Sequence, residues 1–126
     1  MIAVFDTGIL VDESRGYAPA VELMKSVAKK EITGIISMIT EGEMLSGKDC
    51  SKEDMMEKTM NFLGLFIRID ISKEILRKAA EFRRNYDVPL IDCIIASTAF
   101  HENCVLWTKN SKDFRKIKEV RAEEPY

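Results

Sequence analysis

The chain has 126 residues, of which 46% are hydrophobic and 32% charged, a balance typical of one globular domain with its own core. No apolar run approaches the roughly 20 residues of a membrane-spanning helix, and the first residues lack the basic region of a secretory signal, so we expect a cytoplasmic protein. The formal net charge is −2, which excludes overall attraction to nucleic acid, although basic residues outnumber acidic ones from Lys109 to Arg121.

The first half of the chain alternates predicted strands and helices. Residues 2–5 form a short apolar run typical of a buried strand. Apolar side chains recur at helical spacing over residues 20–30, with Pro19 near the start. A second strand is predicted at residues 33–37, followed by helices at 40–45 and 51–61.

The second half continues the alternation. A third strand is predicted at residues 66–69, and Ser72 caps a helix that extends to residue 86. Residues 90–103 are nearly all apolar, which predicts a buried helix. The last predicted elements are a strand at 105–108, a helical turn at 112–117 and a strand at 120–122. Strands separated by helices imply right-handed β-α-β units, and therefore a parallel sheet covered on both faces.

Three cysteines and one histidine limit the chemistry that the chain can perform. Cys50, Cys93 and Cys104 show no C-x-x-C spacing, so we expect neither a zinc site nor a disulfide framework. Cys93 and Cys104 lie in or beside the apolar helix, and we expect both to be buried thiols. His101 lies in the apolar helix, and no G-x-S-x-G pattern accompanies it. A nucleophile activated by histidine is therefore not expected.

Four acids follow or precede predicted elements at one edge of the sheet. Asp6 ends the first strand, Glu43 follows the second, Asp92 opens the apolar helix and Asp113 follows the fourth strand. Ligands of parallel sheets bind at the carboxyl ends of the strands, so we expect these side chains to meet there. Crowded carboxylates repel one another unless a cation lies between them, and hard oxygen ligands suit Mg²⁺ or Mn²⁺ better than zinc.

Each acid also has a simpler interpretation. Thr40 and Glu43 match a helix capping box. Asp92 and Asp113 lie in first helical turns, where acids favour the helix dipole, and Asp6 is placed to cap a turn. Asp92 is the hardest to explain in this way, because it shares its helix face with small and apolar residues, where an unpaired charge is costly.

Four segments have the order and spacing of one known family. They are Val-Phe-Asp-Thr at 4–7, Ile-Ser-x-Ile-Thr-x-x-Glu-x-Leu-x-Gly at 36–47, Ile-Asp-x-x-Ile-Ala-x-Thr-Ala at 91–99 and Leu-x-Thr-Lys-Asn-x-Lys-Asp-Phe at 106–114. Together they span almost the whole chain. The sequence resembles PIN-domain nucleases, and is most similar to the VapC-type toxins of toxin–antitoxin pairs.

The resemblance implies a single Rossmann-like domain over residues 1–126, built as a three-layer α/β/α sandwich with a central parallel sheet. It also implies cleavage of RNA that depends on Mg²⁺, or on Mn²⁺ in its place. Asp6, Glu43 and Asp92 would be the metal ligands, and Asp113 a fourth acid acting directly or through water. A homodimer and an inhibitory antitoxin partner are further expectations. The Met-rich stretch formed by Met55, Met56, Met60, Phe62 and Leu63 is either part of such an interface or a helix face packed on the sheet.

Other residues are expected around the acids. Thr7 and Thr108 would orient ligands or substrate. The residues expected to contact RNA beside them are Lys109, Asn110, Lys112 and Arg115, with Lys116 as a further cation. Asn110 stands where some relatives have another acid, and Gly8 where many have serine.

The sequence leaves one choice of residue and two alternative functions open. Glu41 lies two residues before Glu43, on the opposite side of a helix, and the register of the motif favours Glu43. A PIN-like domain that binds RNA or protein without cleaving it remains an alternative. So does a phospho-acceptor domain of receiver type, with Asp70 as acceptor and Thr108 and Lys109 nearby.

Overall fold

The centre of the protein is a five-stranded parallel sheet in the order β3-β2-β1-β4-β5. The computed structural model describes residues 1–126. The strands are β1 (Ile2–Phe5), β2 (Thr33–Ser37), β3 (Ile67–Ile69), β4 (Val105–Trp107) and β5 (Ala122–Glu123). Because neighbouring strands are parallel, each connection has to cross a face of the sheet.

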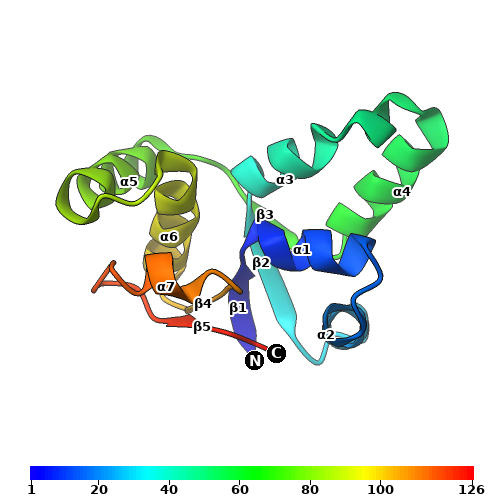
Figure 1. Cartoon of the computed structure of the whole chain (residues 1–126), viewed down its shortest axis with the longest axis horizontal. Helices are drawn as coiled ribbons and strands as arrows, with labels where there is room; N and C mark the ends of the chain where they lie inside the picture. The colour runs from blue at the N-terminus through cyan, green and yellow to red at the C-terminus, as the bar shows by residue number, and fades with distance from the viewer.

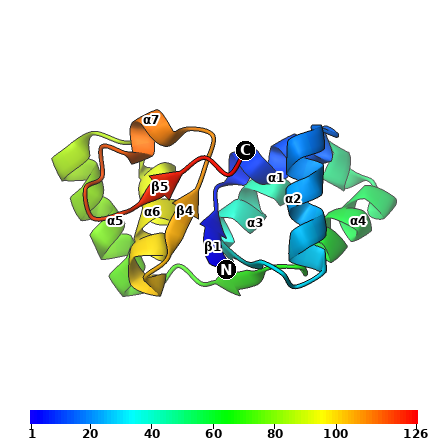
Figure 2. The same ribbon diagram turned by 90° about the horizontal axis from the view of Figure 1, so that it is seen from below.

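Helices cover both faces of this sheet (Figure 1). They are α1 (Thr7–Ser14), α2 (Ala18–Ala28), α3 (Met38–Leu45), α4 (Glu53–Leu63), α5 (Lys73–Tyr86), α6 (Leu90–Glu102) and α7 (Ser111–Phe114), with a 3₁₀ turn, η1, at Lys48–Ser51. Figure 2 shows α5 and α6 on one side of the strands and α1, α2 and α4 on the other. No helix combines the length and the apolar character needed to span a bilayer.

The two faces of β1 belong to two separate apolar cores. Val4 packs into a cluster formed largely by α5 and α6. Ala3 and Phe5, which point to the opposite face of the strand, pack with residues of α1, α2 and α4. The predicted three-layer arrangement is therefore confirmed.

Helix α1 has no counterpart among the predicted elements. Its apolar residues Ile9, Leu10 and Val11 are consecutive, so the segment lacks the periodicity by which a helix is recognised. Ile9 and Leu10 are fully buried, and tertiary packing of this kind stabilises short helices that local propensity alone would not. The predicted turn at 112–117 and strand at 120–122 are displaced, because α7 ends at Phe114 and Val120 is buried in a turn before β5.

The three cysteines are free thiols, as expected. Cys50 and Cys93 are buried and Cys104 is half-buried. Burial raises the pKa of the Cys93 thiol to about 11, which keeps it protonated and unreactive near neutral pH.

The order of the strands places a topological switch point beside β1. The chain adds β2 and β3 on one side of β1 and then β4 and β5 on the other, so the order reverses between β1 and β4. Phe5 pairs with Trp107 in the register of these strands. Asp6 and Thr108 follow directly, at the switch point where ligands of open α/β sheets bind.

Candidate metal centre

Asp6 lies at the switch point with its carboxylate largely buried, since the residue is 9% exposed. Thr108 Oγ1 donates to Asp6 Oδ2 over 2.8 Å. Burial raises the pKa of Asp6, although this hydrogen bond and the backbone N–H groups of Thr7 and Gly8 oppose the rise. Asp6 occupies the N-cap position of α1, yet its side chain makes no capping hydrogen bond. The contact with Thr108, 102 residues away, goes beyond the local capping role that Asp6 could play.

Thr108 lies on the other side of this switch point, directly after β4. It is fully buried, and its hydroxyl both donates to Asp6 and accepts from the backbone N–H of Asn110 at 2.8 Å. A hydroxyl with both roles filled is held in one orientation. Thr108 therefore orients the Asp6 carboxylate.

Glu43 is held from α1. Thr7 Oγ1 donates to Glu43 Oε1 over 2.7 Å, and Thr7 Oγ1 also lies 2.9 Å from Thr40 Oγ1. The capping-box interpretation of Thr40 and Glu43 is wrong, because the N-cap of α3 is Ser37, whose side chain accepts from the N–H of Ile39.

Glu41 has a different partner. Its Oε1 lies 2.7 Å from Arg68 Nη1 on β3, and its side chain is only 14% exposed. Because α3 turns by about 200° between the two acids, Glu41 faces this arginine while Glu43 faces Thr7. This geometry agrees with the choice of Glu43.

Asp92 carries the clearest electrostatic signal. It lies in the first turn of α6, where the helix dipole alone would lower the pKa of an acid. Its pKa is instead raised to about 6, first by burial and then by the charges of Asp6, Asp113 and Glu43. The four acids therefore share one electrostatic environment.

Asp113 lies on α7, at the outer side of this environment. Asn110 Nδ2 donates to its Oδ2 at 3.2 Å, and Lys116 Nζ lies 3.5 Å from its Oδ1. Asn110 thus contacts the fourth acid, and the charge of Asp113 is partly balanced from the solvent side.

The four carboxylates are near one another without converging into a ligand set. No group of three or more His, Cys, Asp and Glu side chains has a metal-binding arrangement. Three of the acids are turned toward neutral donors, Asp6 toward Thr108, Glu43 toward Thr7 and Asp113 toward Asn110. The charges of Asp6, Asp113 and Glu43 raise the pKa of Asp92, whereas common coordination of one cation would require side-chain rotation or bridging water.

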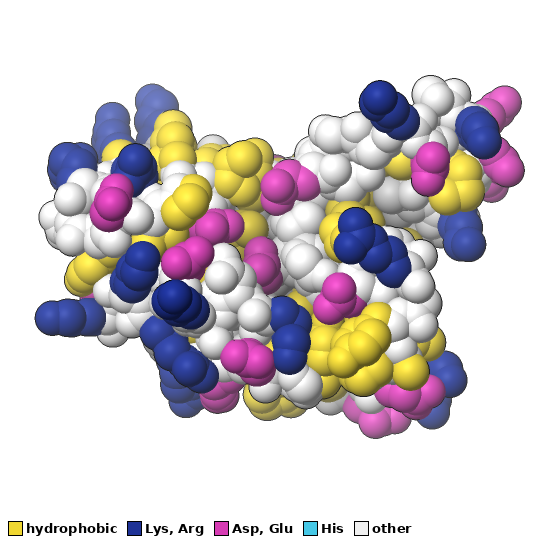
Figure 3. All heavy atoms as spheres, viewed as in Figure 1, with side chains coloured by type: hydrophobic (Ala, Val, Ile, Leu, Met, Phe, Trp, Pro, Cys, Tyr) yellow, Lys and Arg dark blue, Asp and Glu magenta, His cyan; other side chains and the backbone are white.

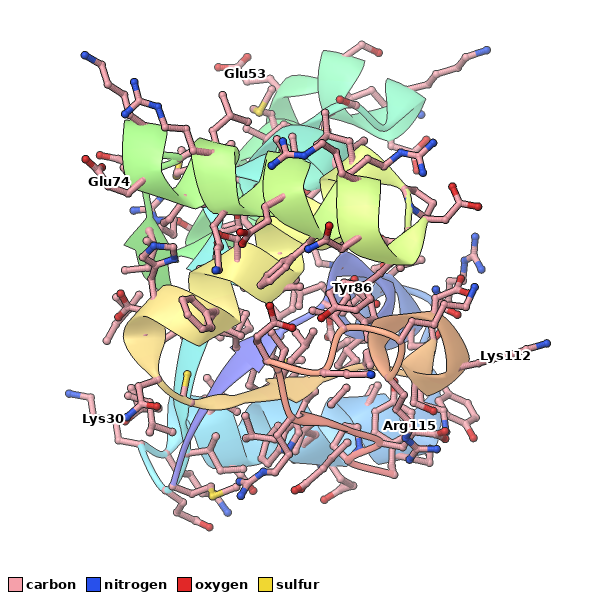
Figure 4. All side chains as sticks on the ribbon, turned by 90° about the vertical axis from the view of Figure 1, so that its left-hand side faces the viewer. Lys30, Glu53, Glu74, Tyr86, Lys112 and Arg115 are labelled. Carbon is pink, nitrogen blue, oxygen red and sulfur yellow. The ribbon has the colours of Figure 1, made fainter.

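Basic side chains border the acids on the side of α5 and α7. Figure 3 shows several acidic side chains near the middle of the face drawn, with lysine and arginine side chains around them. Lys112 and Arg115 are exposed, and Figure 4 shows Lys112 extending away from α7. Lys109 is engaged with the C-terminal segment, donating to Glu124 Oε1 at 3.1 Å and to the carbonyl of Tyr126 at 2.6 Å.

Comparison with known proteins decides the family. The sequence profile of the PIN domain matches residues 3–120. The chain belongs to the PIN domain family. It is 32% identical over 121 residues to Ribonuclease VapC1 of Methanocaldococcus jannaschii, covering 90% of this chain and 84% of that protein.

Two solved structures extend this likeness of the PIN domain to three dimensions. One is a toxin-antitoxin complex from Klebsiella pneumoniae, with a TM-score of 0.81, 31% identity and 98% of each chain covered. The other is VapBC2 from Rickettsia felis bound to a DNA fragment from their promoter, with a TM-score of 0.82, 29% identity and 98% of each chain covered. The matched segment includes Asp6, Glu43, Asp92 and Asp113.

Sequence reasoning misses two features around the site of this PIN domain. The capping-box rule assigns Thr40 to a cap, although it lies at the centre of a matched motif and its hydroxyl contacts Thr7. The anchoring of Lys109 by Glu124 and Tyr126 has no local sequence signal, because the partners are 15 and 17 residues away.

Proposed function

We propose that this PIN domain is a metal-dependent endoribonuclease that acts in the cytoplasm as the toxin of a toxin–antitoxin pair. The observation that carries the proposal is the arrangement of the acids: Thr108 holds Asp6 and Thr7 holds Glu43, and the charges of Asp6, Asp113 and Glu43 contribute to the raised pKa of Asp92. Acids from four segments that lie at one edge of the sheet are costly for the fold, and a bound cation would remove that cost.

The donors fit a hard divalent cation. They are carboxylate oxygens, and His101, the only histidine of the chain, bonds to the Ser97 carbonyl within α6. Oxygen-only sets suit Mg²⁺ or Mn²⁺. Asp6, Glu43 and Asp92 would hold the ion, with Asp113 acting directly or through water.

When bound, the divalent cation supplies Lewis-acid stabilisation of charge on the phosphate and lowers the pKa of a water molecule. The residues of the chain perform the positioning. Thr108 holds Asp6, Thr7 holds Glu43, and Asn110 holds Asp113. Lys112 and Arg115 form no ion pair, so both are available to RNA phosphates beside the acids. Lys109, already bound to Glu124, is assigned an anchoring role.

Incubation of the purified protein with a mixed pool of single-stranded and structured RNA tests this function. We expect cleavage with Mg²⁺ or Mn²⁺, and loss of cleavage in EDTA that is restored by excess metal. An Asp6→Asn protein prepared in parallel controls for contaminating nucleases. Cleavage that continues in EDTA, or that persists in the Asp6→Asn preparation, would contradict the proposal.

The two acids of α3 should differ sharply in their effect on cleavage. Glu43→Gln is expected to lower kcat by about a hundredfold, because a neutral amide is a weaker partner for a cation and the loss corresponds to about 3 kcal/mol. Glu41→Gln should leave kcat near the wild-type value, since it alters only the pair with Arg68. Equal effects of the two substitutions in single-turnover assays would remove the preference for Glu43.

Lys112 in α7 and Arg115 directly after it should contribute to the binding of RNA. In a protein carrying both Lys112→Ala and Arg115→Ala, we expect KM for RNA to rise with kcat almost unchanged, because side chains that bind phosphates away from the reacting bond stabilise ground and transition states alike. The salt dependence of binding should also fall, by about one unit of slope for each phosphate that the protein no longer neutralises. Lys29→Ala with Lys30→Ala, on the helix α2 side, is the matched control; an equal rise of KM there would refute local binding.

The proposals on partners rest on the relative from Klebsiella pneumoniae, which was solved as a toxin-antitoxin complex. A hollow of about 370 Å³ between α1, α2, α3 and α4 is lined by Val21, Met44, Met55 and Phe62 with polar neighbours. Met56 and Met60 are exposed on α4, whereas Leu63 is buried. We assign this hollow, together with the exposed Met56 and Met60, to the binding of an antitoxin segment. A homodimer is also proposed by analogy with the family.

The geometry argues against one alternative, and the EDTA experiment tests the other. For a receiver-type domain, Asp70 would need to lie near Thr108 and Lys109. Asp70 follows the edge strand β3, three strand positions from β4, or about 14 Å. A PIN domain without catalysis would not need the coupled acids, and the EDTA experiment separates it from the enzyme.

A further inference from the structure

Thr40 has a buried hydroxyl that points to the candidate site. The residue lies in α3 and is fully buried. Its Oγ1 lies 2.9 Å from Thr7 Oγ1, and Thr7 Oγ1 lies 2.7 Å from Glu43 Oε1. Three side chains from α1 and α3 thus form a continuous chain of hydrogen bonds that ends on one of the proposed ligands.

The Glu43 carboxylate determines which hydroxyl donates in each of these hydrogen bonds. A carboxylate only accepts, so Thr7 must use its single hydroxyl proton toward Glu43. Thr7 then accepts from Thr40, which is the donor of the first bond. Hydrogen bonds aligned in one direction polarise and strengthen one another, so the Thr40 hydroxyl strengthens the hold of Thr7 on Glu43.

Thr98 shows what a buried helical threonine does elsewhere in this protein. It is also fully buried, but its hydroxyl donates to the Ile94 carbonyl one turn earlier in α6. That bond is the common local choice for threonine in a helix. Thr40 instead bonds across to another helix, so its partner is set by the site and not by its own backbone.

We propose that Thr40 is a positioning residue that, through Thr7, fixes Glu43 Oε1 and leaves Glu43 Oε2 to face a divalent cation. The inference rests on the proposed function. Glu43 Oε2 forms no hydrogen bond or ion pair within the protein, whereas Oε1 is bound by Thr7. Partners that orient a ligand in this way typically change metal affinity or activity by 10–100-fold when they are removed.

The test measures Mn²⁺ affinity by electron paramagnetic resonance, together with kcat and KM for RNA. Thr40→Val keeps the shape of the side chain and removes the donor, and we expect Mn²⁺ to bind about tenfold more weakly, with kcat reduced and KM unchanged. Thr40→Ser restores the donor and should restore both values. Thr98→Val is the matched control and should leave Mn²⁺ affinity at the wild-type level.

A double-mutant cycle tests the route through Thr7. Adding Thr40→Val to Thr7→Val should weaken Mn²⁺ binding little further, because Thr7→Val alone already interrupts the hydrogen bonds between Thr40 and Glu43. Thr40→Ala also removes the donor and carries the test if Thr40→Val does not fold. Weakened Mn²⁺ binding in Thr40→Ala supports the inference.

Three results overturn the role of Thr40. These are wild-type Mn²⁺ affinity in Thr40→Val or Thr40→Ala, equal losses in Thr40→Val and Thr98→Val, and failure of Thr40→Ser to restore binding. A wild-type protein that binds no Mn²⁺, or an Asp92→Asn protein that binds it normally, instead refutes the proposed function, on which this inference depends.

Discussion

Asp92→Asn is expected to reduce metal-dependent RNA cleavage by about a thousandfold or more. The substitution keeps the size of the side chain and removes the charge that couples to Asp6, Asp113 and Glu43. Loss of a cation that contributes several kcal/mol to transition-state stabilisation corresponds to an effect of this size. Single-turnover cleavage of a defined RNA at saturating Mg²⁺ measures it.

Asp70→Asn is the matched control for this loss, because Asp70 is an exposed acid after β3, outside the site. It should retain wild-type cleavage. Retention of more than about a tenth of the activity by Asp92→Asn would be too small an effect for a metal ligand, and would exclude Asp92 from the site.

The same substitution should stabilise the protein in the absence of metal at neutral pH. The pKa of Asp92 is about 6 in the fold and near 3.8 in the unfolded chain. Between about pH 4 and pH 6, Asp92 has lost its proton in the unfolded chain but keeps it in the folded protein. The free energy of unfolding therefore falls as pH rises through this range and stays low above it. A full shift of this size corresponds to about 3 kcal/mol, but Asp92 is only half-buried, and screening by solvent reduces our expectation to about 1 kcal/mol.

Urea unfolding in EDTA at pH 4 and pH 7.5 measures this difference. Wild type and Asp92→Asn should be about equally stable at pH 4, and the variant about 1 kcal/mol more stable at pH 7.5. Comparing the two proteins at each pH cancels the contributions of Glu22, Asp87 and Glu124, whose pKa values are lowered by cationic or hydroxyl partners. An Asp92→Asn protein that is less stable than wild type at pH 7.5 would show that the charge is favourable in the fold.

The positions of the acids follow from simple rules. Asp6 directly follows a short buried strand, and Asp92 lies in the first turn of a nearly all-apolar helix. A parallel sheet brings such residues to one edge. The sequence therefore predicts that Asp6 and Asp92 lie near each other and repel each other.

The hydroxyls that hold the acids could not be predicted in this way. Thr7 begins α1, a helix that tertiary packing stabilises and that lacks helical periodicity. Without α1 there is no reason to place Thr7 against Thr40, and a local rule assigns Thr40 to a cap. The choice between Glu41 and Glu43 likewise depends on Arg68, a partner 27 residues away.

Long-range contacts also change the assignment of the basic residues. Lys109, Lys112 and Arg115 look alike in the sequence, but Glu124 and Tyr126 bind Lys109 from beyond β5. Tyr126 further contacts α1, where its hydroxyl donates to Asp12 at 2.6 Å. Only the fold distinguishes Lys109, which anchors the C-terminal segment, from Lys112 and Arg115, which are free to bind RNA.

The central claim is that Asp6, Glu43, Asp92 and Asp113 surround one cation, and a crystal grown with Mn²⁺ tests it most directly. The anomalous difference map should contain a peak in the crevice between β1 and β4, at ligand distance from Asp6 and Asp92 and with Glu43 turned toward it. The same map from Asp92→Asn crystals should lack the peak. A Mn²⁺ peak elsewhere, such as beside Glu41 or Asp12, with none between Asp6 and Asp92, would contradict the account.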